Sequence, residues 1–313
     1  MPQVEIIKCH GSGNDFILID ATCDQMRGMD ITHFTRWACD REHGIGSDGV
    51  LLLVRLSDGS YGMDMLNPDG THAQMCGNGI RCVARLAEEL GLNTQGILRS
   101  GGSDYPIGRG SDIAEGIKAY TVDIPIRLTS EDFAFFCSDE GFVGEVIAEL
   151  DPTLRFTALN LGNPHIVAAV EHIDMALLES LGQRVKSLTS LFPHGVNVSL
   201  YECRSRDSIF VATYERGAGI TLSCGTAMTA SSTAAALLGH VESGRRIEVR
   251  NRGGKVYCTP TIDKHAIVTR LEGNATFDWW GVVDAEGDSY TYNIARRSTE
   301  DARWQQFVQQ LDL

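Results

Sequence analysis

Two cysteines in matching stretches of the chain, Cys76 and Cys224, are the residues whose setting best suits chemistry. Residues 75–91 read MCGNGIRCVARLAEELG and residues 223–239 read SCGTAMTASSTAAALLG, so the Cys-Gly pair and the closing Leu-Gly align without a gap. The offset is 148 residues, the difference between positions 76 and 224. A second pair of stretches, GNDFI at 13–17 and GNPHI at 162–166, aligns at an offset of 149. The repetition predicts two similar halves with one thiol each.

Each thiol is expected directly before a helix. After Cys76 the apolar residues Val83, Leu86 and Leu90 recur at spacings of three and four, which predicts one buried helical face, and Gly91 is a suitable stop. The free N–H groups and the positive dipole of a helix N-terminus lower the pKa of a thiol and receive carboxylates. Two such thiols that approach a shared cleft from opposite sides would put an acid and a base on the two faces of one carbon. Inversion of a stereocentre requires that arrangement.

His165 and Glu215 are, by motif position, the nearest candidates for a base that orients or ionises a thiol. Each also has a plainer interpretation, because His165 alone suits a core histidine and Glu215 alone suits an ion pair with the adjacent Arg216. The planar fork of Arg216 is suited to two-point binding of a carboxylate. Four side-chain amides are expected to bind amino and carboxylate groups: Asn14, Asn67, Asn163 and Asn197.

The composition is typical of a soluble globular protein, with 43% hydrophobic and 22% charged residues. At 313 residues the chain is long enough for two domains, each with its own core. A formal net charge of −14 and a pI near 5.0 argue against a nucleic-acid surface or an anionic membrane as partner. No signal-peptide pattern opens the chain and no apolar run approaches the length of a membrane span, so we expect a cytoplasmic protein.

Nine cysteines, an odd number without a closely spaced pair of zinc-ligand type, favour reduced thiols over a disulfide framework or a metal site. No metal motif is visible. The glycine-rich stretch at 44–49, GIGSDG, lacks the lysine and the following helix of a phosphate loop, so nucleotide binding is not expected. The cysteines outside the repeat are interpreted as small buried hydrophobes or bystanders: Cys9, Cys23, Cys39, Cys82, Cys137, Cys203 and Cys258.

Short strands and a few helices must position these residues. Asp30 suits the N-cap of one helix, residues 175–181 predict another, and residues 298–301 form a capping-box-like start to a third with Trp304 on its apolar side. The third helix packs either within its own domain or against another subunit. Residues 97–117, rich in Gly, Ser and Asp, are predicted to be loop. Strands are predicted at 4–7, 16–19, 50–54, 61–66, 119–126, 196–200, 209–214, 246–249, 256–260, 266–271 and 275–283.

These elements predict an α/β (α+β) fold of two pseudo-symmetric domains. The first domain comprises residues 1–127 with a C-terminal return over 275–313. The second, the pseudo-repeat, comprises residues 128–274.

Taken together, the motifs resemble those of the diaminopimelate epimerases, a family of cofactor-independent amino-acid racemases. The resemblance covers roughly residues 4–283. It implies that each domain wraps its strands around a central helix and that the substrate cleft lies between the domains. Ile220 and Ala227 depart from the Glu and Gly usual in the family. The matching motifs are HGSGNDF at 10–16, GIGSDG at 44–49, NPDG at 67–70, MCGNGIRC at 75–82, GNPH at 162–165, VN at 196–197, YERGAG at 214–219 and CGT at 224–226.

The resemblance implies that Cys76 and Cys224 form a two-base pair, assisted by His165 and Glu215, that converts LL-diaminopimelate to meso-diaminopimelate. It implies no cofactor and no metal, and a homodimer is expected. The residues implied to bind the distal amino-acid end of the substrate are Asn14, Asn67, Asn163, Asn197 and Arg216. Peptide N–H groups implied to hold the reacting α-carboxylate are those around Gly77, Asn78, Gly225 and Thr226.

Two alternatives stay open. The first is a racemase of the same fold that acts on another amino acid, such as histidine. Proline racemases, a related branch, carry a His where this chain has Asn78, which counts against that branch. The second alternative is a protein that binds an amino acid without turning it over, although both cysteines are present.

Overall fold

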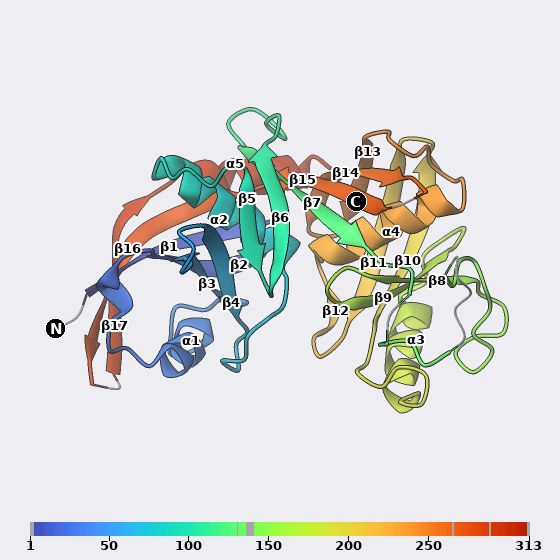
Figure 1. The fold of residues 1–313 in the computed structure, drawn as a ribbon, viewed down its shortest axis with the longest axis horizontal. Helices are drawn as coiled ribbons and strands as arrows, with labels where there is room; N and C mark the ends of the chain where they lie inside the picture. Colours follow the sequence, from blue (N-terminus) through green and yellow to red (C-terminus); the bar gives the residue numbers. More distant parts are fainter. Residues whose placement is uncertain (1–2, 130, 136–140, 265, 288, 312–313) are drawn as a thin grey trace. The chain divides into compact units, whose positions relative to one another are not determined.

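A computed structural model describes residues 3–129, 131–135, 141–264, 266–287 and 289–311 (Figure 1). The chain divides into two compact units, the first made of Met1–Val122 with Gly273–Asp312 and the second of Asp123–Glu272. The sequence had suggested divisions after residues 127 and 274. Within the described residues, no helix is long and apolar enough to cross a membrane.

The first unit is built on strands that hydrogen-bond in the order β17, β16, β1, β2, β3, β4, β5 and β6; β6 also pairs with the first half of β7, a strand that begins in the first unit and ends in the second. From β1 to β6 the successive pairings are antiparallel, parallel, antiparallel, parallel and antiparallel. The strands are β1 (Gln3–Gly11), β2 (Asn14–Ala21), β3 (Val50–Arg55), β4 (Tyr61–Leu66), β5 (Ile97–Ser100), β6 (Ser103–Arg109), β7 (Ala119–Ile126), β16 (Thr276–Glu286) and β17 (Ser289–Arg297).

The second unit repeats this plan. Its strands follow the order β8, β9, β10, β11, β13, β14 and β15, and from β8 to β14 the pairings run in the same alternation of senses. The short strand β12 (Gly219–Thr221) pairs with β11. The remaining strands are β8 (Phe156–Asn160), β9 (Pro164–Ala169), β10 (Asn197–Ser205), β11 (Ser208–Glu215), β13 (Ile247–Asn251), β14 (Gly254–Ile262) and β15 (Ile267–Asn274).

One buried helix occupies the centre of each unit (Figure 1). In the first unit α2 (Gly77–Glu89) packs against β1, β2 and β3, and it is buried from its first residue to Ala87. In the second unit α4 (Gly225–Leu237) packs against β9, β10, β11, β13 and β14 and is buried to Ala235. The predicted fold class, strands wrapped around a central helix in each of two similar halves, is therefore confirmed.

Peripheral helices complete each unit. In the first, the helix α1 (Ile31–Cys39) begins at Asp30, whose carboxylate accepts from the N–H groups of Thr32 and His33, as predicted for its N-cap. The first unit also holds a short 3-10 helix, η1 (Asp24–Met26), and the C-terminal helix α5 (Glu300–Gln309). The second unit contains α3 (Met175–Ser187).

Two local predictions were wrong, and one strand was missed. Residues 97–117, predicted as loop, contain the hairpin of β5 and β6, which turns at Gly101 and Gly102 with positive φ. Strand β17 was not predicted at all, because its largely exposed, polar residues show little apolar alternation. Leu90, placed on the buried face of α2, is 45% exposed, since that helix ends at Glu89.

The C-terminal helix packs within its own unit, which resolves one alternative left open by the sequence. Trp304 is 1% exposed, and its ring lies 5.6 Å from that of His10 between centroids. The helix therefore covers the base of the turn that follows β1.

Candidate active site

Cys76 is the N-cap residue of α2, directly before the helix, as the apolar spacing after it predicted. Its Sγ accepts a hydrogen bond from the N–H of Gly79 at 3.3 Å. The thiol therefore lies among the peptide groups at the positive end of a buried helix. This end of the helix is also where Gly77 and Asn78, the implied binders of a carboxylate, begin the first turn.

Asn14 lies beside this thiol. Its Oδ1 is 4.0 Å from Cys76 Sγ and accepts from Asn78 Nδ2 at 3.2 Å. On its other side, Asn14 Nδ2 donates to Asp48 Oδ2 at 2.7 Å, and Arg41 in turn bonds Asp48 Oδ1 at 2.8 Å. The carboxylate of Asp48 fixes the orientation of the Asn14 amide, so that the carbonyl oxygen faces the thiol. Sequence reasoning had found Asn14 but assigned nothing to Asp48.

Arg81 was also missed, although its side chain is fully buried in the first unit. It donates to Gly77 O at 3.2 Å, to Asn78 Oδ1 at 3.0 Å and to Ser12 Oγ at 3.3 Å. In the second unit, the residue at the repeat offset is Thr229, whose hydroxyl donates to Gly225 O at 2.8 Å. The signal in the sequence was a polar position one helical turn after the Cys-Gly pair in both halves.

Cys224 occupies the matching N-cap position of α4. Its Sγ lies 3.4 Å from Thr226 Oγ1, and Thr226 Oγ1 also accepts from Asn163 Nδ2 at 3.3 Å. The Asn163 and Thr226 contact stands at the same repeat positions as the Asn14 and Asn78 contact of the first unit. Each unit thus joins its asparagine to the first turn of its thiol-bearing helix.

His165 extends the polar network of the second unit. Its Nε2 lies 3.1 Å from Asn163 Oδ1 and 3.4 Å from Asn197 Nδ2. Burial, with a contribution from the charge of Arg216, lowers the pKa of His165 to about 3. The ring is therefore neutral at physiological pH.

Asn197 links this histidine to the turn that carries Arg216. Asn197 Oδ1 accepts from the backbone N–H of Arg216 at 2.8 Å, and Asn197 Nδ2 donates to Pro164 O at 3.2 Å. The exposed guanidinium of Arg216 donates to His194 O at 2.6 Å. Glu215 accepts a short hydrogen bond from the hydroxyl of Thr221. The backbone thus orients Arg216 while its side chain stays near the surface.

Asn67 lies in a different setting from the other asparagines. It follows β4 in the predicted turn, where Gly70 N–H donates to Asn67 O at 2.8 Å. Its side chain donates to Thr71 Oγ1 at 3.0 Å within that same turn.

Ile220, one of the two residues that differ from the usual family pattern, packs against the hydrophobic core of the second unit.

The expected low thiol pKa values are wrong for this structure. Burial raises the pKa of Cys76 to about 11, although the N–H groups of Gly79 and Asn78 and the charge of Arg81 act to lower it. Burial, followed by the neighbouring Glu215 carboxylate, raises the pKa of Cys224 well above its usual value. Desolvation of a thiolate outweighs the helix-end N–H groups on which the prediction relied.

The other cysteines of the described residues are free thiols. Four of them are buried: Cys9, Cys39, Cys82 and Cys258. Cys23 and Cys203 are exposed, and Cys137 lies outside the described residues.

Comparison with known proteins agrees with the motifs. A sequence model of the family described as diaminopimelate epimerase matches residues 6–101 and 157–277. The chain is 35% identical over 315 residues to the diaminopimelate epimerase of Clostridium acetobutylicum, covering 98% of this chain and 94% of that relative. It is 34% identical over 321 residues to the diaminopimelate epimerase of Listeria monocytogenes, covering 99% and 98%.

Solved structures share the fold at much lower identity. A phenazine biosynthesis protein of the PhzF family from Bacillus anthracis matches with a TM-score of 0.66 at 15% identity, covering 91% of this chain and 100% of that one. A probable proline racemase from Agrobacterium radiobacter matches with a TM-score of 0.61 at 14% identity, covering 91% and 93%. At these identities the similarity concerns the fold alone.

Proposed function

Because the chain belongs to the diaminopimelate epimerase family, we propose that it is an isomerase that converts LL-diaminopimelate to meso-diaminopimelate, a precursor of lysine and peptidoglycan. One observation carries the proposal. Each unit presents a cysteine at the N-cap of its buried central helix, with an asparagine bonded to the first turn of that helix. Two equivalent proton carriers are what inversion at one carbon needs.

In the proposed reaction, one cysteine thiolate takes the α-proton and the other cysteine, as a thiol, delivers its proton to the opposite face. The C–H bond electrons remain on the α-carbon and then form the new C–H bond, so the two sulfurs exchange protonation states in each turnover. The mechanism requires Cys76 and Cys224 to reach opposite faces of the same carbon. It requires no cofactor, since the two thiols supply both the base and the acid.

The surroundings of the two thiols support different resting roles. Burial raises the pKa of both thiols, but Arg81 and the first-turn N–H groups oppose this rise at Cys76, whereas the Glu215 carboxylate adds to it at Cys224. Cys76 is therefore the easier thiol to ionise, and we assign it as the thiol that gives up its proton to become the base. Cys224, which burial and Glu215 keep protonated, is then the acid.

The substrate has a carboxylate at the reacting centre and a second amino-acid end. We assign the reacting carboxylate to the peptide N–H groups at the starts of α2 and α4, where helix-end dipoles stabilise negative charge as the carbanion forms. The guanidinium of Arg216 can donate two hydrogen bonds to one carboxylate, which suits it to the distal carboxylate. Asn14, Asn163 and Asn197 are assigned to distal amino or carboxylate groups because they line the polar networks next to these elements. Asn67 is assigned to the same end.

Incubation of the purified protein with LL-diaminopimelate in deuterated water, without added cofactor, tests the proposal. We expect deuterium at one α-carbon of the product and formation of the meso isomer by chiral chromatography. Parallel incubations with L-histidine and a panel of other L-amino acids identify the substrate. Exchange with another amino acid alone would favour a different racemase, and binding without exchange would show a non-catalytic protein. A Cys76→Ala, Cys224→Ala double variant is the control.

We further propose a cytoplasmic location and a homodimer. The free thiols of the described residues support a reducing compartment. The largely exposed strand β17 supports the dimer, because an exposed strand offers backbone groups to a second chain. Sedimentation equilibrium of the purified protein tests the oligomeric state.

A further inference from the structure

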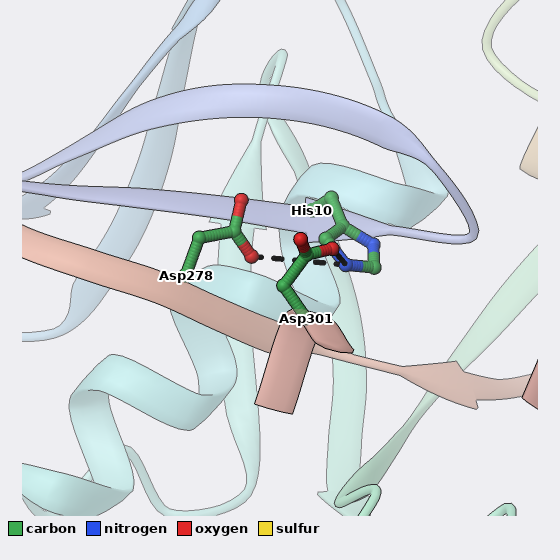
Figure 2. Close-up of side chains that lie close together, drawn as sticks. All are labelled: His10, Asp278 and Asp301. Carbon is green, nitrogen blue, oxygen red and sulfur yellow. Dashed lines mark ion pairs between the residues drawn. The ribbon is translucent and has the colours of Figure 1, made fainter. Parts of the chain in front are cut away.

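A second polar cluster lies in the first unit, where His10 of β1 faces Asp278 of β16 and Asp301 of α5 (Figure 2). His10 Nε2 lies 3.7 Å from Asp278 Oδ1 and 3.5 Å from Asp301 Oδ1. The His10 side chain is 4% exposed. Among the described residues, neither His10 Nε2 nor Asp278 Oδ1 has a hydrogen bond of good geometry. One imidazole and two carboxylates at these separations have the composition of a divalent-metal site.

The other side of the imidazole argues against a metal. Gly13 N lies 3.3 Å from His10 Nδ1, and a backbone N–H can only donate. Asn274 Nδ2 lies 3.3 Å from the same nitrogen, and its amide orientation is fixed because Asn274 Oδ1 accepts from Ser12 N at 2.8 Å. Nδ1 is therefore an acceptor, and the neutral ring carries its proton on Nε2. A protonated nitrogen has no lone pair for a metal, so Nε2–H faces the two carboxylates instead.

We propose that His10 is a positioning residue for the Cys76 half of the site, held in its Nε2–H tautomer by Asp301 and Asp278. The inference rests on the proposed function. In this tautomer, the Nδ1 lone pair accepts a hydrogen bond from the N–H of Gly13. This bond stabilises a turn with an unfavourable backbone conformation, because Ser12, a residue with a Cβ, has a φ of 56° and the following Gly13 has a φ of 81°.

The turn at Ser12 and Gly13 is followed by Asn14, which lies beside the Cys76 thiol. Asn14 follows Gly13 and places its Oδ1 4.0 Å from Cys76 Sγ. A small movement of the turn would therefore move the amide that faces the thiol, and displacements of this size at a reacting group are costly. His10 itself touches neither the thiol nor the implied substrate groups. It acts through the backbone of Gly13 and through Asn274.

The two carboxylates have different roles. Asp301 Oδ1 is the nearer carboxylate oxygen to His10 Nε2, at 3.5 Å against 3.7 Å for Asp278 Oδ1, and His10 is the main cause that lowers the pKa of Asp301. Burial raises the pKa of Asp278 to about 7, and the charge of Asp301 adds to the rise. Through Asp301, the C-terminal helix α5 fixes the tautomer of a histidine two residues before the turn. The tail of the chain is thereby connected to the candidate active site.

Nitrogen-15 NMR of the histidine-labelled protein measures the tautomer directly, with the His10 signals identified by their loss in His10→Leu. We expect a neutral ring with its proton on Nε2. A neutral ring with its proton on Nδ1 would overturn the proposal. So would Zn²⁺ or Mn²⁺ bound at one equivalent to the parent protein and lost in Asp301→Ala. This measurement needs no enzymatic activity, so it decides the inference even if the parent exchanges no α-hydrogen and the proposed function fails.

Kinetics with LL-diaminopimelate separate positioning from simple stability. His10→Asn keeps an acceptor oxygen near the place of Nδ1, whereas His10→Leu removes it. We expect kcat to fall about 10-fold or more in His10→Leu and to stay within about three-fold of the parent in His10→Asn. The control is His43→Leu, at a side chain that is 79% exposed. Parental kcat in a folded His10→Leu protein, or equal losses in both His10 variants, would overturn the proposal.

A second pair of variants applies if His10→Leu does not fold. Asp301→Asn keeps a side-chain oxygen that can face the Nε2–H, and Asp301→Ala removes it. We expect a larger loss of kcat in Asp301→Ala than in Asp301→Asn, at matched melting temperatures. Equal kcat values in the parent and Asp301→Ala would contradict the proposed role.

Discussion

Arg85 and Glu300 form a two-point ion pair between the helix that Cys76 begins and the C-terminal helix. Arg85 Nη2 lies 2.8 Å from Glu300 Oε1, and Arg85 Nη1 also bonds the second carboxylate oxygen. The Arg85 side chain is 2% exposed and donates to Ala275 O at 2.7 Å as well. The pair therefore attaches α5 to the central helix of the first unit through a buried charge.

Glu300→Ala should lower the free energy of unfolding by about 3 kcal/mol, because it leaves a buried guanidinium without its main carboxylate. Urea denaturation measures the change. Gln306→Ala, at an exposed position of the same helix, is the matched control and should stay within about 0.5 kcal/mol of the parent. A loss no larger than that of the control would show that the ion pair contributes nothing net.

Cys76→Ala and Cys224→Ala should each lower kcat on the order of 10³-fold or more, because each face of the α-carbon needs its own proton carrier. Cys76→Ala should also cost about 1 kcal/mol of stability, since it removes the cap on Gly79 N–H. Exposed Cys203→Ala is the control. Near-parental turnover in either variant would rule out the two-base mechanism.

Alkylation of Cys76 by iodoacetamide should follow its raised pKa. In the Cys224→Ala background, the rate at Cys76 should still be rising above pH ~9, because alkylation follows the thiolate fraction and the pKa is about 11. Mass spectrometry of the modified peptide measures the rate at each pH. A plateau already at neutral pH would mean that the helix-end N–H groups outweigh burial.

Arg216→Lys should raise KM for diaminopimelate at least about 10-fold, because an ammonium cannot reproduce a two-point grip on a carboxylate. The melting temperature should change little, since the Arg216 guanidinium is exposed and its backbone N–H bond to Asn197 is kept. Steady-state kinetics beside thermal melting measure both. Lower stability with an unchanged KM would indicate a structural role only.

The neutral His165 should make stability depend on acid pH. Its pKa is lowered to about 3 in the folded protein, against 6.5 for an ordinary histidine, so the unfolded chain binds the extra proton between these values. The free energy of unfolding should fall as pH falls through this window, on the order of 1.4 kcal/mol per pH unit.

Denaturant unfolding between pH 6.5 and 3 measures that slope. Because other groups titrate in the same range, the test is the difference between the parent and His165→Gln, whose slope should be shallower. His43→Gln, at an exposed side chain, should keep the parental slope. Equal slopes in the parent and His165→Gln would contradict the lowered pKa.

Features that depend on residues close together in the chain, such as the ends of a helix, could be predicted from the sequence. The repeat located both thiols, and the apolar spacing together with Gly91 predicted a helix that begins after Cys76 and ends near Gly91. Local periodicity could not show that Arg81 and Arg85 are buried while Leu90 is exposed. A charged side chain is buried only where partners exist, and some partners of each arginine come from segments 190 or more positions away, such as Asn274 O for Arg81 and Glu300 for Arg85.

Strand pairing and the pKa values of the thiols could not be predicted from the sequence either, because both depend on tertiary contacts. The hairpin of β5 and β6 and the strand β17 expose many of their residues, so their apolar pattern is weak and neighbouring strands decide their pairing. The pKa of Cys76 depends on a competition between burial and helix-end N–H groups. Sequence position shows the N–H groups but not the burial.

The opposite charges beside the two thiols bear on the direction of turnover. Arg81 lies in the network of Cys76, and Glu215 neighbours Cys224, so a common backbone frame carries two oppositely polarised half-sites. The equilibrium between the two stereoisomers belongs to the substrates and cannot be altered by either charge. On the proposed mechanism, the polarity instead sets which isomer meets a correctly protonated enzyme. The isomer whose α-hydrogen faces Cys76 meets the thiol that is easier to ionise, whereas the other isomer reacts only when Cys224 is the thiol that has lost its proton.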